Sequence, residues 1–338
     1  MKRGLTAAAI LIITGASGPA MADEAGTTTV HGTMFTDFSW IDQQQDGEDT
    51  SASGLGFDVK RFYFGAKHVF DDVWSANITT DFTYNRDDGE TQVYVKKAYV
   101  EADLSPAAVF RAGSAAMPWI GFVESIEGYR YIDEMLIDRL SFGSSYDWGL
   151  HLGGTTAGGF SYATSLVNGG GYKNPSRSNG MDVAARISFE PVDGLIFGLG
   201  AYNGHRAQDF ADAPAHHTAT RYNALVAYVA ERFRLGVEYF RADNWNNITT
   251  PAIDSANGYS AFASFDIDHR LSIFARYDHT DLSNDLNPSL SDKYYNLGVA
   301  WQAREGIEAA VFYKYEDRSS DMHTLETQEI GIAARIDF

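Results

Sequence analysis

The 338-residue chain contains no cysteine, so it forms no disulfide and offers no thiolate ligand to a metal. The absence of thiols fits an oxidising compartment. Basic residues are also scarce: 26 Lys and Arg stand against 45 Asp and Glu, a formal charge of −19. Nucleic-acid binding needs clustered Lys and Arg, so this balance argues against a nucleic-acid partner.

Long apolar runs are missing as well. After residue 22, no stretch approaches the roughly 20 apolar residues that a membrane-spanning helix needs. The mean hydropathy of −0.26 resembles that of a soluble chain. It does not exclude a membrane barrel, because only every second residue of a barrel strand meets lipid.

Motifs that bind cofactors or metals are absent too. The chain has no glycine-rich phosphate loop and no His-x-x-x-His pair in a helical pattern. His216 and His217 adjoin in a polar stretch, where solvated side chains are the more ordinary interpretation. We therefore expect no cofactor and no metal site.

The first residues have the features of a secretory signal. Lys2 and Arg3 precede an apolar stretch at 5–13, and Ala20–Ala22 has the small-x-small form of a cleavage site. An N-terminal anchor helix is the alternative, for which the apolar stretch is short. We expect residues 1–22 to be a signal peptide and residues 23–338 to be exported to the cell outer membrane.

The last ten residues show the pattern that dominates the rest of the chain. One alternate set is apolar and the other is polar or small: Ile330, Ile332, Ala334, Ile336 and Phe338 against Glu329, Gly331, Ala333, Arg335 and Asp337. Strict alternation predicts an extended strand with one apolar and one wet face. A final aromatic residue suits a strand that ends at a membrane interface.

About sixteen such segments follow one another, most of them near the ten residues that a tilted strand needs to cross a bilayer. Aromatic residues, 14% of the chain, recur at the ends of their apolar rows. The expected starts are residues 27, 57, 74, 93, 107, 148, 160, 182, 195, 220, 232, 257, 270, 293, 306 and 325. The fold class is therefore predicted to be all-β, a transmembrane antiparallel β-barrel of about 16 strands.

The connections between these segments alternate in length. Tight turns such as 71–72, 105–106 and 304–306 alternate with long polar stretches such as 204–219 and 281–292. Short turns at one end and long loops at the other are typical of an outer-membrane barrel. An even strand number puts both termini on the short-turn, periplasmic side and lets the first and last strands pair. A soluble sandwich or propeller, the alternative, does not predict this alternation.

The longest interruption, residues 115–147, is rich in apolar side chains and too long for an ordinary loop. We expect it to fold into the barrel as a constriction loop, because a barrel of this width leaves an aqueous channel. Ile132, Met135, Leu136 and Leu140 recur at helical spacing and predict a short amphipathic helix near its end.

Charged groups on this loop would face charges on the inner wall. The loop candidates are Glu124, Glu127, Arg130, Asp133, Glu134, Asp138 and Arg139. The wall candidates, from inward strand positions, are Arg61, Lys67, Lys97, Arg111, Arg186, Arg221, Arg276, Lys314 and Arg335. For any single residue, a solvated charge paired with a neighbour is the ordinary interpretation. Together, opposed charges across a wet gap orient water and repel apolar solutes.

An ordered series of segments in the first half of the chain resembles a known family. The segments are Lys60–Gly65, Trp74–Asn77, Lys97–Glu101, Phe110–Gly113, Met117–Trp119 and Ile137–Leu140. The series resembles the phosphate-selective porins O and P of Gram-negative bacteria over roughly residues 57–155, with Trp119 in place of the family's phenylalanine.

The resemblance implies a sixteen-stranded, trimeric outer-membrane diffusion channel, with outer-membrane lipid and lipopolysaccharide as surroundings. It does not extend to phosphate specificity, which in that family depends on clustered Arg and Lys at the narrowest point. Here the loop carries only Arg130 and Arg139 among five acids.

We expect a non-enzymatic porin in which small hydrophilic solutes and ions diffuse passively, with a lean toward anions from the arginine-rich wall. Two alternatives remain open. One is a barrel hydrolase, for which the candidates near strand ends are His205, His279, His323, Asp281 and Ser283. The other is a non-conducting structural or adhesive barrel.

Overall fold

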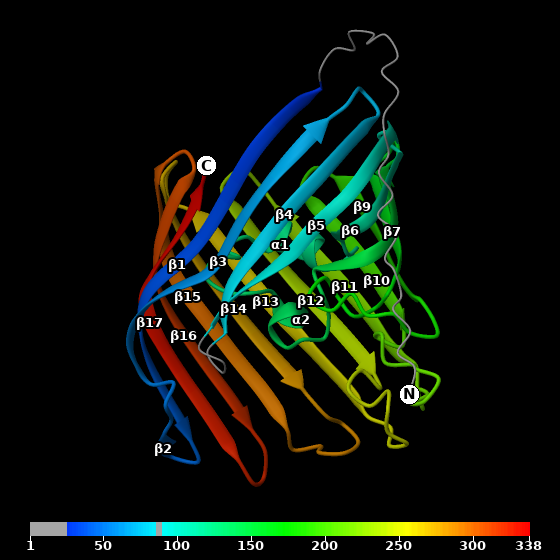
Figure 1. Ribbon diagram of the computed structural model, residues 1–338. Coiled ribbons are helices and arrows are strands. Elements are labelled where there is room, and N and C mark those ends of the chain that lie inside the picture. The colour runs from blue at the N-terminus through cyan, green and yellow to red at the C-terminus, as the bar shows by residue number, and fades with distance from the viewer. Residues whose placement is uncertain (1–25, 86–89) are drawn as a thin grey trace, which may run out of the picture.

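The computed structural model describes residues 26–85 and 90–338. The predicted signal peptide, residues 1–22, lies outside them. The described part is almost entirely β-structure (Figure 1). The strands are β1 (Thr27–Gln45), β2 (Glu48–Asp49), β3 (Gly54–Val69), β4 (Trp74–Asn85), β5 (Glu90–Ser105), β6 (Ala108–Ala116), β7 (Tyr146–Thr155), β8 (Phe160–Val167), β9 (Asp182–Val192), β10 (Leu195–Gly204), β11 (Ala219–Val229), β12 (Phe233–Asp243), β13 (Ser255–Asp266), β14 (Leu271–Asp281), β15 (Ser291–Arg304), β16 (Ile307–Ser319) and β17 (Thr324–Asp337).

The sheet closes on itself. Each long strand pairs antiparallel with its neighbours in sequence, and β1 pairs with both β3 and β17. The two-residue β2 only extends the outer end of β1, so sixteen strands form the wall. The predicted fold class is confirmed. The expected starts lie close to those observed, the largest differences being 57 against Gly54 and 93 against Glu90.

Short turns and long loops lie at opposite ends of the barrel. In Figure 1 the short turns are at the top and the long loops at the bottom. Strand β1 begins and β17 ends on the short-turn side, where Gly32 N–H donates to the Phe338 carbonyl at 2.8 Å. The antiparallel pairing of β1 with β17 closes the described wall, so neither strand presents a free edge to lipid.

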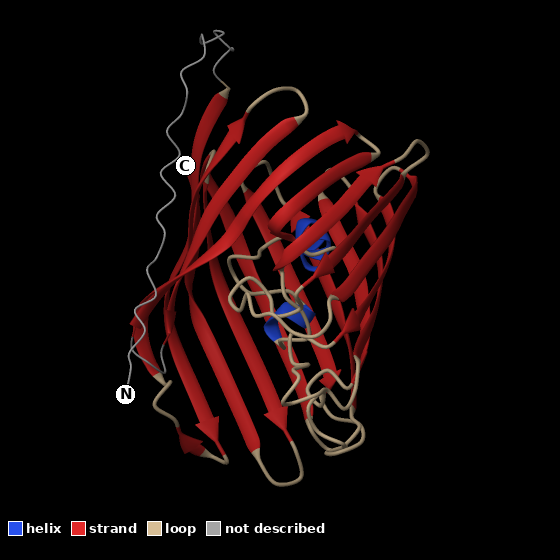
Figure 2. Cartoon of the chain, turned by 45° about the vertical axis from the view of Figure 1, so that its right-hand side comes forward, coloured by secondary structure: helices blue, strands red, loops and turns tan. Residues whose placement is uncertain are grey.

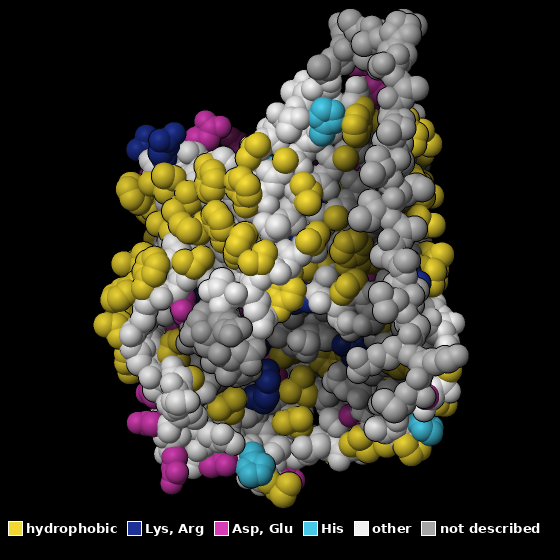
Figure 3. All heavy atoms as spheres, viewed as in Figure 1, with side chains coloured by type: hydrophobic (Ala, Val, Ile, Leu, Met, Phe, Trp, Pro, Cys, Tyr) yellow, Lys and Arg dark blue, Asp and Glu magenta, His cyan; other side chains and the backbone are white. Residues whose placement is uncertain are grey.

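The outer face of the wall is apolar. Ile78, Val311 and Ile332 are 54%, 56% and 55% exposed, as the alternation predicts. Hydrophobic side chains gather on the outer face in Figure 3, while the acidic side chains in view lie mainly near the two ends. A row of tyrosines crosses neighbouring strands toward the long-loop side, and Tyr277 and Tyr295 have ring centroids 4.7 Å apart. Such a row is typical of a membrane interface.

The connection between β6 and β7 folds into the lumen, where Figure 2 shows its two helices inside the ring of strands. We call residues 117–145 the inner loop; β6 ends at Ala116 and β7 begins at Tyr146, so it is two residues shorter at each end than expected. It contains α1 (Ile120–Glu127) and α2 (Leu136–Arg139). No helix among the described residues combines the length and apolar character needed to cross a bilayer.

The helix prediction for this loop was partly wrong. Only Leu136–Arg139 is helical in the predicted stretch. Ile132 lies in the turn before it, and Met135 is the N-cap residue with an extended backbone. The longer α1 was not predicted. Its buried residues, Ile120, Val123 and Ile126, stand at positions i, i+3 and i+6 and face the wall.

The inner face beneath the loop is apolar, which corrects the expectation of a wet inner face on every strand. Inward side chains of β11 and β12, including Leu225 and Phe240, pack with the loop's Ile120 and Val123 in one hydrophobic cluster. Glycine permits the closest approach: a Cβ on Gly200 would lie 2.5 Å from the Trp119 ring. The inner loop is therefore held by a small hydrophobic core inside the barrel.

Candidate functional site

Arg130 is the centre of the loop's own charge cluster. Its guanidinium lies 2.6 Å from Glu124, 2.9 Å from Glu134 and 3.8 Å from Asp138. Glu134 also reaches the wall, where Arg61 of β3 lies 2.8 Å away. One carboxylate thus joins an arginine of the loop to an arginine of the wall.

A second cluster joins the loop to β14–β16. Arg276 lies 2.9 Å from Glu127 and 2.6 Å from Asp278, and it donates to the Glu134 carbonyl at 2.7 Å. Arg139 at the end of α2 lies 2.5 Å from Asp292 and also contacts Asp278 and Glu316. Asp278 and Asp292 are fully buried. Buried carboxylates need such partners, because an uncompensated charge is costly in a dry site.

A third cluster forms between the loop and β15–β17. Lys314 lies 3.3 Å from Asp133 and 2.9 Å from Glu329. The Tyr294 hydroxyl donates to Asp133 at 2.8 Å. The structure thus brings every predicted loop charge into contact with a partner of opposite sign.

Two further lysines, Lys60 and Lys96, lie in the lumen, where strict alternation along their strands does not place them. On β3, Arg61 and Val59 face consecutive residues of β1, so Lys60 is the extra residue of a β-bulge. On β5, Lys97 and Val95 face consecutive residues of β4, so Lys96 is extra there. Strict alternation would send each of these lysines into lipid; the bulge turns it inward.

The two lysines have different surroundings. Lys60 lies 2.6 Å from Asp37 and donates to the Ile132 carbonyl of the inner loop at 3.3 Å. Lys96 lies 4.3 Å from the centroid of the Tyr63 ring and donates to its hydroxyl at 3.1 Å. Among the described residues, no carboxylate lies within 4.0 Å of Lys96 or Lys97.

The other predicted wall residues are spread along the lumen. Arg186 donates to the Pro118 carbonyl at 3.0 Å and so contacts the loop. Lys67 and Arg111 share Glu101, at 3.4 and 2.6 Å. They lie toward the short-turn end, away from the loop.

Arg221 and Arg335 complete the predicted wall set. Arg335 pairs with Asp337 at 2.8 Å, at the short-turn end of β17. Arg221 is buried beneath the loop, and its guanidinium donates to the Phe142 carbonyl.

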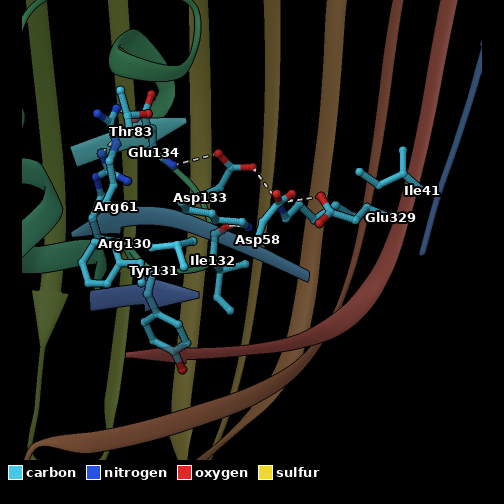
Figure 4. A pocket seen from close by; sticks show the side chains of 14 residues that line it. Ile41, Asp58, Arg61, Thr83, Arg130, Tyr131, Ile132, Asp133, Glu134 and Glu329 are labelled. Carbon is cyan, nitrogen blue, oxygen red and sulfur yellow. Dashed lines mark hydrogen bonds and ion pairs between the residues drawn. The ribbon is translucent and has the colours of Figure 1, made fainter. Parts of the chain in front are cut away.

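A cavity of about 310 Å³ remains between the wall of β1, β3 and β4 and the loop (Figure 4). Its charged lining is balanced: the basic residues are Lys60, Arg61, Arg130 and Lys314, and the acidic ones are Asp58, Asp133, Glu134 and Glu329. A gap lined by both signs suits water and small polar solutes.

The pKa values of the buried loop acids are shifted in opposite directions, depending on the charges beside them. Burial raises the pKa of Glu127 to about 7, although Arg276 opposes the shift. Burial and the neighbouring Glu134 raise the pKa of Asp138 to about 7. Burial would also raise the pKa of Asp133, but Lys314 and Lys60 outweigh it and hold the value below normal.

The candidate hydrolase residues do not assemble. His279 lies 3.5 Å from Asp281, but the Ser283 hydroxyl accepts the N–H of Asn287 instead of meeting a histidine. His205 faces Thr218, and His323 faces Asp46. In the part of the chain that the structure describes, no group of three or more His, Asp or Glu side chains forms a metal site.

The sequence profile of the Gram-negative porin family matches residues 5–324. No curated protein matches the chain in sequence. Among solved structures, the outer membrane channel DcaP of Acinetobacter baumannii is similar, with a TM-score of 0.67 and 10% identity over 94% of this chain and 99% of that one.

Two further structures are similar over 93% of this chain and 100% of theirs. They are an anion-selective porin from Comamonas acidovorans, with a TM-score of 0.63 and 12% identity, and OmpT of Vibrio cholerae in a trimer form, with 0.62 and 13%. At such identities the likeness shows the fold alone. The profile match covers nearly the whole wall and the inner loop, and on this ground the chain belongs to the Gram-negative porin family and is an outer-membrane channel for small solutes.

Proposed function

We propose that solutes pass the barrel through an eyelet between the inner loop and the wall of β1, β3 and β4. The contacts that support this are those between Glu134 and Arg61 and between Asp133 and Lys314, which hold the loop across the lumen. The cavity beside them offers a path lined by charges of both signs. We expect passive diffusion of small hydrophilic solutes and ions along this path. Apolar solutes are disfavoured, because they cannot replace the hydrogen bonds between water and the charged lining.

We further propose that the pore prefers anions. The eyelet cavity is balanced, so the preference rests on basic groups that have no carboxylate within 4.0 Å among the described residues. Lys96 and Lys97 of β5 are two such groups, and the phenol of Tyr63 is the hydrogen-bond partner of Lys96. A fixed positive charge raises the local concentration of anions in a narrow wet passage. A porin of similar fold, that of C. acidovorans, is described as anion-selective.

The reversal potential in a tenfold KCl gradient tests this preference. The reversal potential of the wild-type pore should lie between zero and the equilibrium potential of chloride. The pair Lys96→Gln and Lys97→Gln should move it toward zero. The matched control neutralises two outward basic residues instead, Arg241→Gln and Lys293→Gln, and should leave it unchanged. A cation-side potential in the wild type would reject the proposal.

The finer resemblance to the phosphate-selective porins stays a prediction, and we do not extend phosphate specificity to this chain. The reason lies in the inner loop, where Arg130 and Arg139 each form ion pairs with acidic side chains at 3.4 Å or less. Competition of phosphate with chloride at equal ionic strength would reveal any such specificity.

We also propose that residues 1–22 direct export and that the chain acts without catalysis. We further propose that three copies assemble in outer-membrane lipid and lipopolysaccharide. OmpT of V. cholerae, similar in fold, is described in a trimer form. The match to the Gram-negative porin family supports a channel that acts without catalysis. Unheated gel mobility and cross-linking of purified protein should give a trimer; a monomer in lipid would reject the assembly.

A further inference from the structure

A second cavity, of about 290 Å³, lies on the long-loop side of the inner loop. Three long loops contribute Lys173, Arg206 and Trp245 to its lining, and β11 contributes Arg221. A solute that arrives from the long-loop side would meet this cavity before the eyelet. We refer to it as the vestibule cavity.

The acids of the vestibule cavity are already engaged. Glu134 is shared by Arg61 and Arg130. Asp138 lies 3.8 Å from Arg130. Asp147 accepts backbone N–H groups of Trp148 and Gly169, at 2.7 and 3.0 Å.

Three of its basic groups have no such partner: among the described residues, no carboxylate lies within 4.0 Å of the side-chain nitrogens of Lys173, Arg206 or Arg221. Asp182 contacts Arg206 only through the backbone N–H, at 2.7 Å. Arg221 is the informative one, because it is only 5% exposed. Its Nε donates to Asn223 at 2.9 Å and its Nη1 to the Phe142 carbonyl, both neutral acceptors. The Asn223 side-chain amide nitrogen is itself buried and has no hydrogen-bond partner among residues 26–85 and 90–338.

Trp245 fixes the geometry of the two arginines. Its ring centroid lies 4.5 Å from the Arg206 guanidinium and 5.1 Å from that of Arg221. The indole N–H donates to the Ser141 carbonyl of the inner loop at 2.9 Å, which ties the ring in place. Two guanidinium groups are therefore held beside one ring with the cavity in front of them.

A buried guanidinium with only neutral partners is costly unless an anion completes it. Guanidinium groups bind planar or tetrahedral oxyanions through paired N–H donors. We propose that the vestibule cavity is a binding subsite for a small oxyanionic solute, held by Arg221 and Arg206, with Lys173 as a further basic group in its lining. This inference rests on the proposed channel function, because an oxyanion bound in the vestibule cavity lies on the path to the eyelet.

Inhibition of the chloride current through single channels tests the subsite. Sodium acetate or sodium phosphate is added on the long-loop side at constant ionic strength, and the concentration for half inhibition is measured. We expect saturable inhibition in the wild type. Saturation by acetate alone assigns the subsite to carboxylates, by phosphate alone to phosphate, and by both to oxyanions in general.

Variants separate the subsite from general charge effects. Arg221→Gln should raise the half-inhibition concentration about tenfold or more, as expected for loss of a charged hydrogen bond. Arg221→Lys should raise it less, and Arg206→Gln decides the matter if Arg221→Gln does not fold. The matched control is Arg234→Gln, an inward arginine near the short-turn end, which should leave it unchanged.

Absence of saturable inhibition, or an equal rise in Arg234→Gln, would overturn the proposal. The outcome is distinguishable from that of the anion preference, because the reversal potential in KCl needs no oxyanion. A pore that prefers cations but still shows saturable inhibition would reject the preference and keep the subsite.

Discussion

At the scale of the residue, the orientation of each strand depends on whether its charged side chains face lipid or the lumen. An Arg or Lys turned to lipid at mid-membrane costs about 2–4 kcal/mol. The sequence places two basic residues in succession at Lys60–Arg61 and again at Lys96–Lys97. In both places the structure inserts a bulge, which turns both members inward. Two bulges therefore add positive charge to one side of the lumen.

The charge of the inner loop should depend on pH near neutrality. The pKa values of Glu127 and Asp138 are both raised to about 7, so both carboxyls are largely ionised at pH 8 and largely neutral at pH 6. Acidification thus removes negative charge from the lumen. We expect the reversal potential in a KCl gradient to move further toward the chloride side between pH 8 and pH 6.

The variant Asp138→Asn should reduce this pH dependence and fix the pore nearer its low-pH state. Asp243→Asn, at the end of β12 and half-exposed, serves as the matched control and should leave the profile as in the wild type. A reversal potential that does not change between pH 6 and pH 8, or that moves toward the cation side, would contradict the assignment.

The sequence predicts some of the charged residues of the site but not those that lie at β-bulges. Arg61, Arg276 and Lys314 follow from alternation alone, and each contacts the loop. Lys60 and Lys96 do not, because alternation carries no sign of a bulge. Two adjacent basic residues in a lipid-facing pattern are the signal that could have found them.

At the scale of the element, the inner loop is held by packing as much as by charge. Its helices bury Ile120, Val123, Leu136 and Ile137 almost completely against the wall. The sequence predicts that the loop enters the lumen, from its apolar content. It does not predict where the loop docks, because nothing in the sequence distinguishes the inward apolar residues of β11 and β12 from apolar residues that face lipid.

Truncation of a buried loop residue should loosen the eyelet. Leu136→Ala removes a fully buried side chain and should destabilise the docked loop by about 2–5 kcal/mol. We expect single-channel records with added transitions between conductance levels. Leu297→Ala, on the lipid face of β15 and 53% exposed, is the control that should conduct as the wild type does. Steady wild-type records from Leu136→Ala would show that packing does not hold the loop.

The bulge on β5 makes a second prediction for an element. Deletion of Lys96, the extra residue, leaves Val95 facing outward and Lys97 inward, so the barrel should fold in normal yield. Deletion of Ala98 should instead force one lysine toward lipid and lower the yield. The measurement is the fraction of refolded protein that shows the faster gel mobility of an unheated barrel. Equal yields for the two deletions would contradict this account of the bulge.

At the scale of the whole molecule, two periodicities carry the fold. Alternation of side chains gives the wall its two faces, and alternation of short and long connections gives the barrel its two ends. Both can be read from the sequence, so strand number, closure between β1 and β17, and the position of the termini were predictable. The lumen was less so, because its packing joins residues far apart in the chain, such as Trp119 and Gly200.

The most direct test of the whole account is the single-channel conductance of the purified, folded protein in a planar bilayer. A wall with lipid outside and a water path past the inner loop predicts stepwise, ohmic currents whose size grows in proportion to salt concentration. Protein that inserts with the gel mobility of a folded barrel yet gives no such steps would contradict it.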